Sequence, residues 1–562
     1  MMEAWRLDHV NNVGHVVTET AARMPDGIAV AAAAKKGPKK STPKTPIRYD
    51  EITFGDLEAK TNRLARGFID AGVNKGDRIA LMVPPGIEFV AMVFALFKCG
   101  AVVILIDPGM GRKNMLHCLS SADPVGMVGI PLAHIVRLMK RKSLPLCKKN
   151  FVVGTFLGAT KVSSFDSLDR GALQPLDVSR EDAAAIIFTT GSTGPPKGVL
   201  YRHRTFIEQS QQIRDYFNIQ PGTVDVSGFP LFALFNTAMG TTTVFPEMDP
   251  TRPANVHPPN IIDAVNKYQA GQSFGSPALW NTVSKFCESE QVRLPTVKRI
   301  LSAGAPVPAH VLRRIKSVIA EDGDAFTPYG ATEALPVACN SATVVLEETG
   351  AHTDNGAGTC VGSSFETMRW KVIEISDDPI SEIEDCRELP AMETGELIVQ
   401  GVTVTDQYVT SPRANEFHKI KDGDEFWHRM GDVGYMDGSN RFWFCGRKSH
   451  RVQTATGTMF TVTCEAIFNT HPDVYRSALV GVGSVGQQTP VIIAELLDLK
   501  NVSESRKQAI VEELKALAAK NWHTDKIERV LIHPALPVDI RHNSKIFREK
   551  LRPWAAKQLE TS

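Results

Sequence analysis

An apolar strand followed by hydroxyl, glycine and lysine residues makes positions 186–199 the part of the sequence best suited to chemistry. Backbone N–H groups of such a turn can point at an anion, hydroxyl groups add donors, and lysine adds positive charge. The turn therefore predicts a polyphosphate site, with an ordinary glycine-rich surface turn as the alternative. Its spacing is not that of a Walker loop. The residues concerned are Thr189, Thr190, Gly191, Ser192, Thr193, Gly194 and Lys197.

Alternating helix and strand patterns precede this turn and must position it. Periodicity predicts helices over 54–72 and 87–99, and strands over 77–83 and 101–106. Alternation of this length favours parallel sheets covered by helices. We therefore expect an α/β fold.

Composition indicates a globular protein of more than one domain. The chain has 562 residues, of which 43% are hydrophobic, and a formal net charge of +1. Such a balance provides no overall field for nucleic acid. Nine cysteines without paired spacing indicate neither a disulfide framework nor a zinc site. Because no signal pattern is visible, a cytoplasmic location is expected.

Two other stretches have alternative interpretations. The apolar stretch 89–106 is interrupted by Lys98 and Gly100, so a buried helix and strand are favoured over a membrane span. The basic run 34–44 fits a solvated loop between two strands, or a site for an acidic partner.

The sequence TTGSTGPPKGV resembles the phosphate loop of the adenylate-forming superfamily, which includes acyl-CoA ligases, luciferases and peptide-synthetase adenylation domains. The resemblance implies that ATP activates a carboxylate, giving an acyl-adenylate and pyrophosphate, with Mg²⁺ as the metal. LSAGAP resembles the adenine-contacting turn, at Gly304, Ala305 and Pro306. TPYGATE is similar to the next family motif. It implies that Tyr329 stacks on adenine beside Gly330, that Thr332 binds the α-phosphate, and that Glu333 holds Mg²⁺ together with Thr190.

Further family segments extend the resemblance to the C-terminus. WHRMGDVGY implies that Asp432 binds the ribose, and CGRK implies that Arg447 faces ribose and phosphate. In LPVDIRHNSKIF, Lys545 corresponds to the lysine that enters the adenylation site, although relatives usually carry glycine before it. The catalytic set is therefore expected to include Lys545, Glu333 and Thr190.

The resemblance also implies the domain organisation. Residues 1–447 would form a large N-terminal adenylate-forming domain of helix-covered sheets, with a small β-rich subdomain over 343–400. Residues 448–562 would form a small mobile α+β lid with Ser449 near the hinge.

The acid site is expected in FPLFALFN. Relatives often carry histidine where Ala233 stands, which implies a wider or differently shaped pocket. The proposed wall suits a long alkyl chain, whereas a plain apolar core is the alternative for each aromatic residue. It comprises Phe229, Phe232, Ala233, Leu234 and Phe235. His203, in YRHRTF, is a candidate for the catalytic set near the phosphates, with packing in the core as the equal alternative.

Within the superfamily, PPKGVLYRHRTF and LPVDIRHNSKIFREKL are similar to the β-lactone synthetases of bacterial long-chain olefin biosynthesis. This implies activation of a 2-alkyl-3-hydroxy acid and attack by its own hydroxyl, with other enzymes of an olefin pathway as partners. The alternatives are a long-chain acyl-CoA ligase and a non-catalytic nucleotide-binding scaffold. Chain length, stereochemistry, the base for hydroxyl attack and the oligomeric state stay open.

Overall fold

The computed structural model describes residues 5–42, 44–167, 173, 176–189, 194–539 and 545–560. Its largest sheet has 14 strands in the order β17-β18-β20-β21-β16-β15-β14-β13-β12-β10-β11-β1-β2, with β19 beside β20. The parallel part comprises β1 (Ile28–Ala33), β11 (Thr242–Phe245), β10 (Val224–Ser227), β12 (Gln272–Gly275), β13 (Arg299–Ser302) and β14 (Asp324–Ala331).

The rest of this sheet is antiparallel; β2 lies at one edge beside β1, and the other strands form the β-rich part of the molecule. The antiparallel strands are β2 (Tyr49–Thr53), β15 (Ala334–Ser341), β16 (Thr359–Ser364), β17 (Met368–Ile373), β18 (Gly395–Gly401), β19 (Lys419–Asp422), β20 (Glu425–Met436) and β21 (Arg441–Arg447).

A second sheet of seven strands has the order β7-β6-β5-β3-β4-β8-β9. All its pairs are parallel except β8 with β9, which form the hairpin around the glycine-rich turn. The strands are β3 (Arg78–Met82), β4 (Val102–Leu105), β5 (Gly126–Gly129), β6 (Lys149–Val152), β7 (Thr160–Lys161), β8 (Ala183–Phe188) and β9 (Gly198–Arg202).

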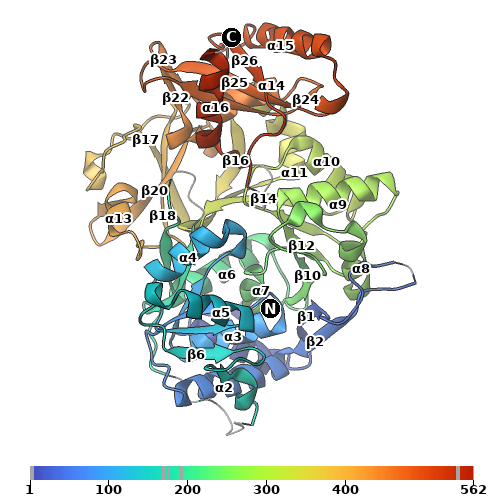
Figure 1. Cartoon of the computed structure of the whole chain (residues 1–562), viewed down its shortest axis with the longest axis vertical. Helices are drawn as coiled ribbons and strands as arrows, with labels where there is room; N and C mark the ends of the chain where they lie inside the picture. The colour runs from blue at the N-terminus through green and yellow to red at the C-terminus, as the bar shows by residue number, and fades with distance from the viewer. Residues whose placement is uncertain are drawn as a thin grey trace.

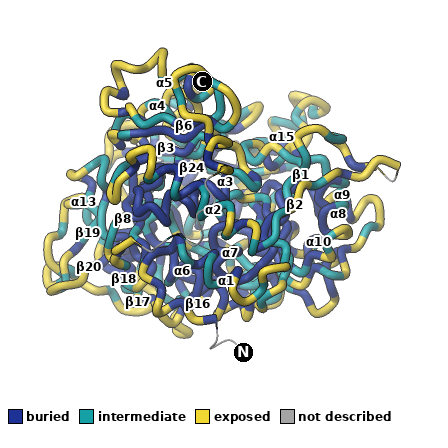
Figure 2. The backbone as a smooth tube through the Cα atoms, turned by 90° about the horizontal axis from the view of Figure 1, so that it is seen from below, coloured by how far each residue is buried: buried dark blue, intermediate teal, exposed yellow. Residues whose placement is uncertain are grey.

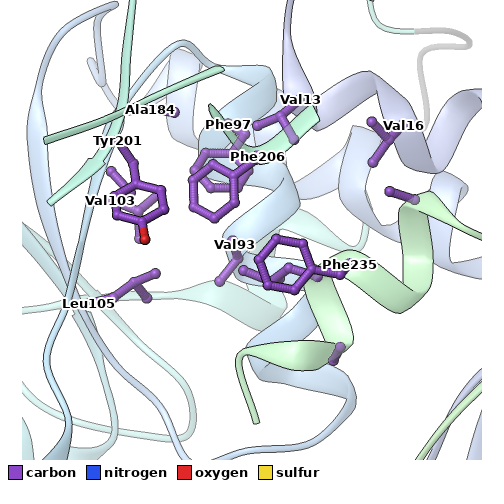
Figure 3. Close-up of a cluster of buried hydrophobic side chains, with 14 of the residues drawn as sticks. Val13, Val16, Val93, Phe97, Val103, Leu105, Ala184, Tyr201, Phe206 and Phe235 are labelled. Atoms are coloured by element: carbon purple, nitrogen blue, oxygen red, sulfur yellow. The ribbon is translucent and has the colours of Figure 1, made fainter. Parts of the chain in front are cut away.

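Helix α3 (Ile87–Lys98) contacts β4 of one sheet and β1 of the other. Its residues from Phe89 to Lys98 are all buried, as expected of a helix that is apolar on every side. Figure 3 shows its Val93 and Phe97 in one cluster with Phe206 and Phe235. The two large sheets therefore share a core.

The other helices of residues 1–447, which we call the body, cover these two sheets. They are α1 (Val16–Arg23), α2 (Phe54–Asp70), α4 (Arg112–Ser121), α5 (Pro131–Met139), α6 (His203–Phe217), α7 (Phe232–Ala238), α8 (Pro258–Tyr268), α9 (Pro277–Ser289), α10 (Ala309–Val318), α11 (Ala342–Val344), α12 (Gly350–Asp354) and α13 (Pro412–His418).

The C-terminal part stands at the top of Figure 1, in orange and red, above the ends of the yellow strands. It has its own core around a three-stranded sheet and a two-stranded sheet. Its elements are β22 (Val452–Thr454), β23 (Gly457–Met459), α14 (Thr461–Phe468), β24 (Val474–Val482), β25 (Thr489–Leu496), α15 (Glu504–Ala518), β26 (Arg529–Ile532) and α16 (Arg548–Glu560).

The α/β fold class predicted from the sequence is confirmed, with helix-covered sheets, a β-rich part and a small C-terminal α+β part. The basic run lies between β1 and β2, as expected of a loop. No helix in the described ranges is long and apolar enough to cross a membrane. The division into a body of residues 1–447 and a mobile lid stays a prediction.

Candidate active site

The carboxyl ends of the parallel strands of both large sheets open into one cavity of about 3130 Å³. This edge is where ligands bind in open α/β sheets. The cavity brings together most of the predicted site. The predicted residues that line it are Thr189, Gly194, Lys197, Phe229, Phe232, Gly304, Ala305, Pro306, Tyr329, Gly330, Thr332, Glu333, Phe235, Asp432, Arg447 and Lys545.

The glycine-rich turn lies between β8 and β9, and its described residues Thr189, Gly194 and Lys197 line the cavity. The backbone N–H of Thr189 donates to the carbonyl of Lys197 at 3.0 Å, which closes the base of the turn. Thr190, Gly191, Ser192 and Thr193 lie outside the described residues, so their predicted phosphate contacts stay predictions.

Lys197 is held by a histidine that no sequence motif indicated. The Nδ1 of His418 lies 3.3 Å from the carbonyl of Arg429, so this nitrogen carries the proton and donates. Nε2 is therefore the acceptor for the Lys197 ammonium, 3.0 Å away. Burial lowers the pKa of His418 to about 3, so the imidazole is neutral at pH 7.

Glu333 follows β14 and is fixed by groups from a later part of the chain. The Tyr408 hydroxyl donates to its Oε1 at 2.6 Å, and the backbone N–H and the hydroxyl of Thr405 each donate to its carbonyl at 2.9 Å. Burial lowers the pKa of nearby Lys419 to about 7, against the attraction of Glu333. A carboxylate near the glycine-rich turn fits Mg²⁺, which prefers oxygen ligands and bridges phosphates.

Asp432 and Arg447 are cross-strand neighbours on β20 and β21. The Arg447 guanidinium lies 2.9 Å from Asp432 Oδ1, and the Tyr329 hydroxyl donates to Oδ2 at 2.5 Å. The Asp432 side chain is 5% exposed and the Arg447 side chain 39%. Burial raises the pKa of Asp432, and the adjacent guanidinium opposes this rise. The carboxylate is thus oriented at the cavity wall, where it can accept hydroxyl hydrogen bonds.

The adenine turn predicted from LSAGAP follows β13 directly. Gly304 has φ of 97°, a conformation that strains other residues, so glycine is required at this bend. It lines the cavity together with Ala305 and Pro306. A flat ligand can therefore approach the backbone here.

Lys545 reaches the cavity from the C-terminal part. Its carbonyl accepts from the Asp539 N–H at 2.9 Å, and its neighbour Ile546 forms a bridge with Val538. Burial lowers the pKa of His450 to about 3, and the positive charges of Arg548, Arg447 and Lys545 lower it further. Lys545 therefore contributes charge to the cavity wall that also contains Arg447.

The expected acid pocket is only partly formed by the residues proposed for it. Phe229 and Phe232 line the cavity and pack against Phe274, with ring centroids 5.7 and 4.3 Å away. Ala233 and Leu234 lie on α7 together with Phe232. They are only 0% and 5% exposed, and they do not line the cavity. The helix turns these two toward the core, so their assignment to the pocket wall is wrong.

His203 is not in the cavity. Its side chain is fully buried, its Nδ1 accepts from the Val13 N–H at 3.1 Å, and its ring packs 6.1 Å from that of Phe97. Burial lowers its pKa to about 4. Of the two interpretations, packing in the core is therefore correct, and a catalytic role near the phosphates is wrong.

Residues that sequence reasoning missed come from the segment between β18 and β20. Tyr408, His418 and Lys419 surround Lys197 and Glu333, although more than 70 positions separate them from either. The segment has no recognisable motif. Its only signal was the adjacent pair His418 and Lys419, which follows Phe417.

The cavity combines the glycine-rich turn, the two oriented carboxylates Glu333 and Asp432, and Lys545 from the C-terminal part. Comparison with known proteins identifies the class of protein to which these features belong. Residues 17–409 match the family described as AMP-binding enzyme. The chain belongs to this family, and is an adenylate-forming enzyme that uses ATP.

Two relatives of high identity indicate the kind of adenylate-forming enzyme to which this chain is similar. The chain is 43% identical over 557 residues to an olefin beta-lactone synthetase of Stenotrophomonas maltophilia, covering 98% of this chain and 99% of the relative. It is 42% identical over 561 residues to an olefin beta-lactone synthetase of Xanthomonas campestris, with coverage of 98% and 99%. The fold is similar to that of ATP-bound MatB from Rhodopseudomonas palustris, with a TM-score of 0.76 and 18% identity, covering 97% and 99% of the two chains.

Proposed function

We propose that this enzyme activates a long-chain 2-alkyl-3-hydroxy acid with ATP and closes it to a β-lactone, releasing pyrophosphate and AMP. The observation that carries the proposal is identity above 40% over nearly the full length of two olefin beta-lactone synthetases. The cavity adds chemical support, because nucleotide-binding groups and an apolar wall share it. The product would then pass to other enzymes of an olefin pathway.

In the proposed first step, ATP lies across the ends of the strands. Asp432 accepts hydrogen bonds from the ribose hydroxyls, and the ring of Tyr329 and the Gly304 turn hold adenine. Lys197 and the glycine-rich turn bind the phosphates, and Thr332 binds the α-phosphate. The neutral His418 keeps Lys197 directed at the cavity without adding a second charge.

Mg²⁺ would be held by Glu333 and Thr190, and it would neutralise charge on the phosphate oxygens. The Tyr408 hydroxyl supports this role, because its hydrogen bond fixes one oxygen of the Glu333 carboxylate.

Lys545 would sit between the substrate carboxylate and the α-phosphate. A carboxylate oxygen attacks the α-phosphorus, and the bond to pyrophosphate breaks. An ammonium at this place holds two anions in line and stabilises developing charge. We infer that the lid begins after Arg447 and carries Lys545 into place.

In the second step, the substrate's own 3-hydroxyl oxygen attacks the acyl carbon. A ring C–O bond forms, the bond from the acyl carbon to AMP breaks, and the hydroxyl proton is lost. The attack is intramolecular, which is a large source of rate. Phe229, Phe232 and Phe235 would hold alkyl carbon, at about 0.8 kcal/mol per buried methylene.

The test is product analysis by mass spectrometry with a 2-alkyl-3-hydroxy acid and with a plain fatty acid, each with Mg-ATP and with or without CoA. We expect lactone and AMP from the hydroxy acid when CoA is absent. Strict dependence on CoA would overturn the proposal in favour of an acyl-CoA ligase. Lys545→Ala should abolish pyrophosphate release, whereas unchanged release would contradict the role of Lys545.

A further inference from the structure

Helix α5 presents an apolar face that no described element covers. Four of its nine residues are large, apolar and strongly exposed: Leu132 at 64%, Ile135 at 47%, Leu138 at 49% and Met139 at 77%. Leu146 adds a fifth exposed apolar side chain just beyond the helix, at 51%. Figure 2 places α5 at the edge of the molecule, beside exposed chain. Contiguous exposed apolar surface of this kind marks a binding surface.

Three basic residues directly follow α5 in the sequence. Lys140, Arg141 and Lys142 are all exposed, and none of them forms an ion pair with any described residue. Asp123 is the only acidic residue between positions 112 and 149, a segment that carries eight lysines and arginines. The local surface is therefore basic although the whole chain is nearly neutral.

The same face borders the active-site cavity. Leu132, Ile135 and Met139 are exposed and also line the cavity that contains Lys197 and Glu333. Leu138, Leu146, Arg141 and Lys142 stand outside that lining. One part of the apolar face of α5 thus lies at the entrance of the cavity. The other part is exposed to solvent only.

We propose that α5 and the turn after it, residues 131–146, form a docking surface for an anionic lipid bilayer. Aliphatic side chains beside a cluster of lysine and arginine are the pattern of an interfacial helix, which buries its apolar face among lipids while its charges meet anionic headgroups. A protein partner fits less well, because lysine is depleted in protein interfaces and aromatic residues anchor them. Residues 131–149 contain no Phe, Tyr or Trp.

Docking in this orientation places the cavity mouth against the lipid. An acid with long alkyl chains could then enter the cavity from the bilayer without crossing water. Transfer of its alkyl chains from lipid into water would cost their full hydrophobic transfer free energy. This inference does not depend on lactone formation. Binding to vesicles needs neither ATP nor an acid, so failure of one proposal is distinguishable from failure of the other.

The test is co-sedimentation of the full-length protein with vesicles of phosphatidylcholine alone or with 30% phosphatidylglycerol. We expect binding to the anionic vesicles, weakening at high salt, and little binding to the neutral ones. Arg141→Glu with Lys142→Glu should weaken binding by about tenfold or more, and Leu138→Ser with Leu146→Ser should also weaken it. Neither pair lines the cavity, so pyrophosphate release with a short, soluble 3-hydroxy acid should be unchanged.

Matched controls separate this face from general charge and exposure. Lys35→Glu with Lys36→Glu makes the same charge change in the basic loop, and Val485→Ser changes an apolar side chain that is 69% exposed in the C-terminal part. Both should bind vesicles like the wild type. Absence of binding, or equal weakening by the control charges, would overturn the proposal. Variants of α5 that change only the oligomeric state in solution, measured by light scattering, would assign this face to a protein instead.

Discussion

At the scale of single residues, tyrosine hydroxyls orient two of the carboxylates that line the cavity. Tyr329 donates to Asp432, and Tyr408 donates to Glu333. A hydrogen bond to a charged group contributes about 1.5–3 kcal/mol. Each carboxylate is therefore set in place before a ligand arrives.

Buried histidines give a prediction about pH. The folded-state pKa of His203 is about 4, below its ordinary value of 6.5, because the ring is buried. Between these values the unfolded chain binds a proton that the folded protein does not, so stability falls as pH decreases from 7 toward 4. Linkage gives a loss of about 2 kcal/mol between pH 7 and pH 5 from this group alone.

His203→Gln should remove that part of the pH dependence. We expect the difference between urea midpoints at pH 7 and pH 5 to be smaller in the variant than in the wild type. His117→Gln, at an exposed position, should leave the difference unchanged. Because His203 lies outside the cavity, the variant should also retain ATP–pyrophosphate exchange at pH 7. Equal pH dependence in the variant and the wild type would contradict this account.

At the scale of elements, one ion pair connects the Lys545 segment to helix α14. Arg548 Nη2 donates to both Glu465 oxygens, at 2.6 and 2.7 Å, and the Leu479 N–H donates to Oε1 at 2.8 Å. Both side chains are largely buried, at 15% and 10% exposure. Arg548 follows Lys545 by three residues, so this pair fixes the chain just after the lysine to α14.

Removing this pair should reduce activity as well as stability. Arg548→Met leaves a buried carboxylate unpaired, which costs about 3–5 kcal/mol and should lower the melting temperature. The double variant Glu465→Gln with Arg548→Met removes that penalty. If the pair positions Lys545, the double variant should recover much of the melting temperature, while kcat for pyrophosphate release stays at least about tenfold low. Full recovery of kcat would mean that the role is only structural.

At the scale of the whole molecule, the body and the C-terminal part meet at one cavity. Gly446 is the penultimate residue of β21 and has φ of 143°, and a Cβ there would lie 2.6 Å from the Thr461 hydroxyl of α14. Lys448 then bonds to Glu396 of β18 at 3.0 Å and holds the start of the connection on the body. The connection is thus close-packed at the point where we place the hinge.

A ligand that spans both parts should stabilise the whole chain. We expect a non-hydrolysable acyl-adenylate analogue at 100 times its Kd to add about 2.7 kcal/mol of stability, read as a rise in melting temperature. Lys545→Ala should bind the analogue more weakly, so the rise at the same concentration should be smaller. A rise of the same size in Lys545→Ala would show that the analogue makes no use of the lysine.

Local chemistry made much of the fold predictable from sequence. The expected helix over 87–99 and strand over 101–106 correspond to α3 and β4 within two residues at each end. Hydrophobic periodicity and turn residues determine structure between residues that are close in sequence, so a single sequence is enough to predict the elements they form. The same holds for Gly304 and Asp432, which lie in short motifs.

The tertiary structure decided what depends on packing between distant segments. Burial placed His203 in the core, and the rotation of α7 turned Ala233 and Leu234 away from the cavity. Strand pairing brought Tyr408 and His418 to Glu333 and Lys197, and left the apolar face of α5 exposed. A sequence specifies the side chains and their local backbone, but solvent exposure and long-range partners are set only when the elements pack together.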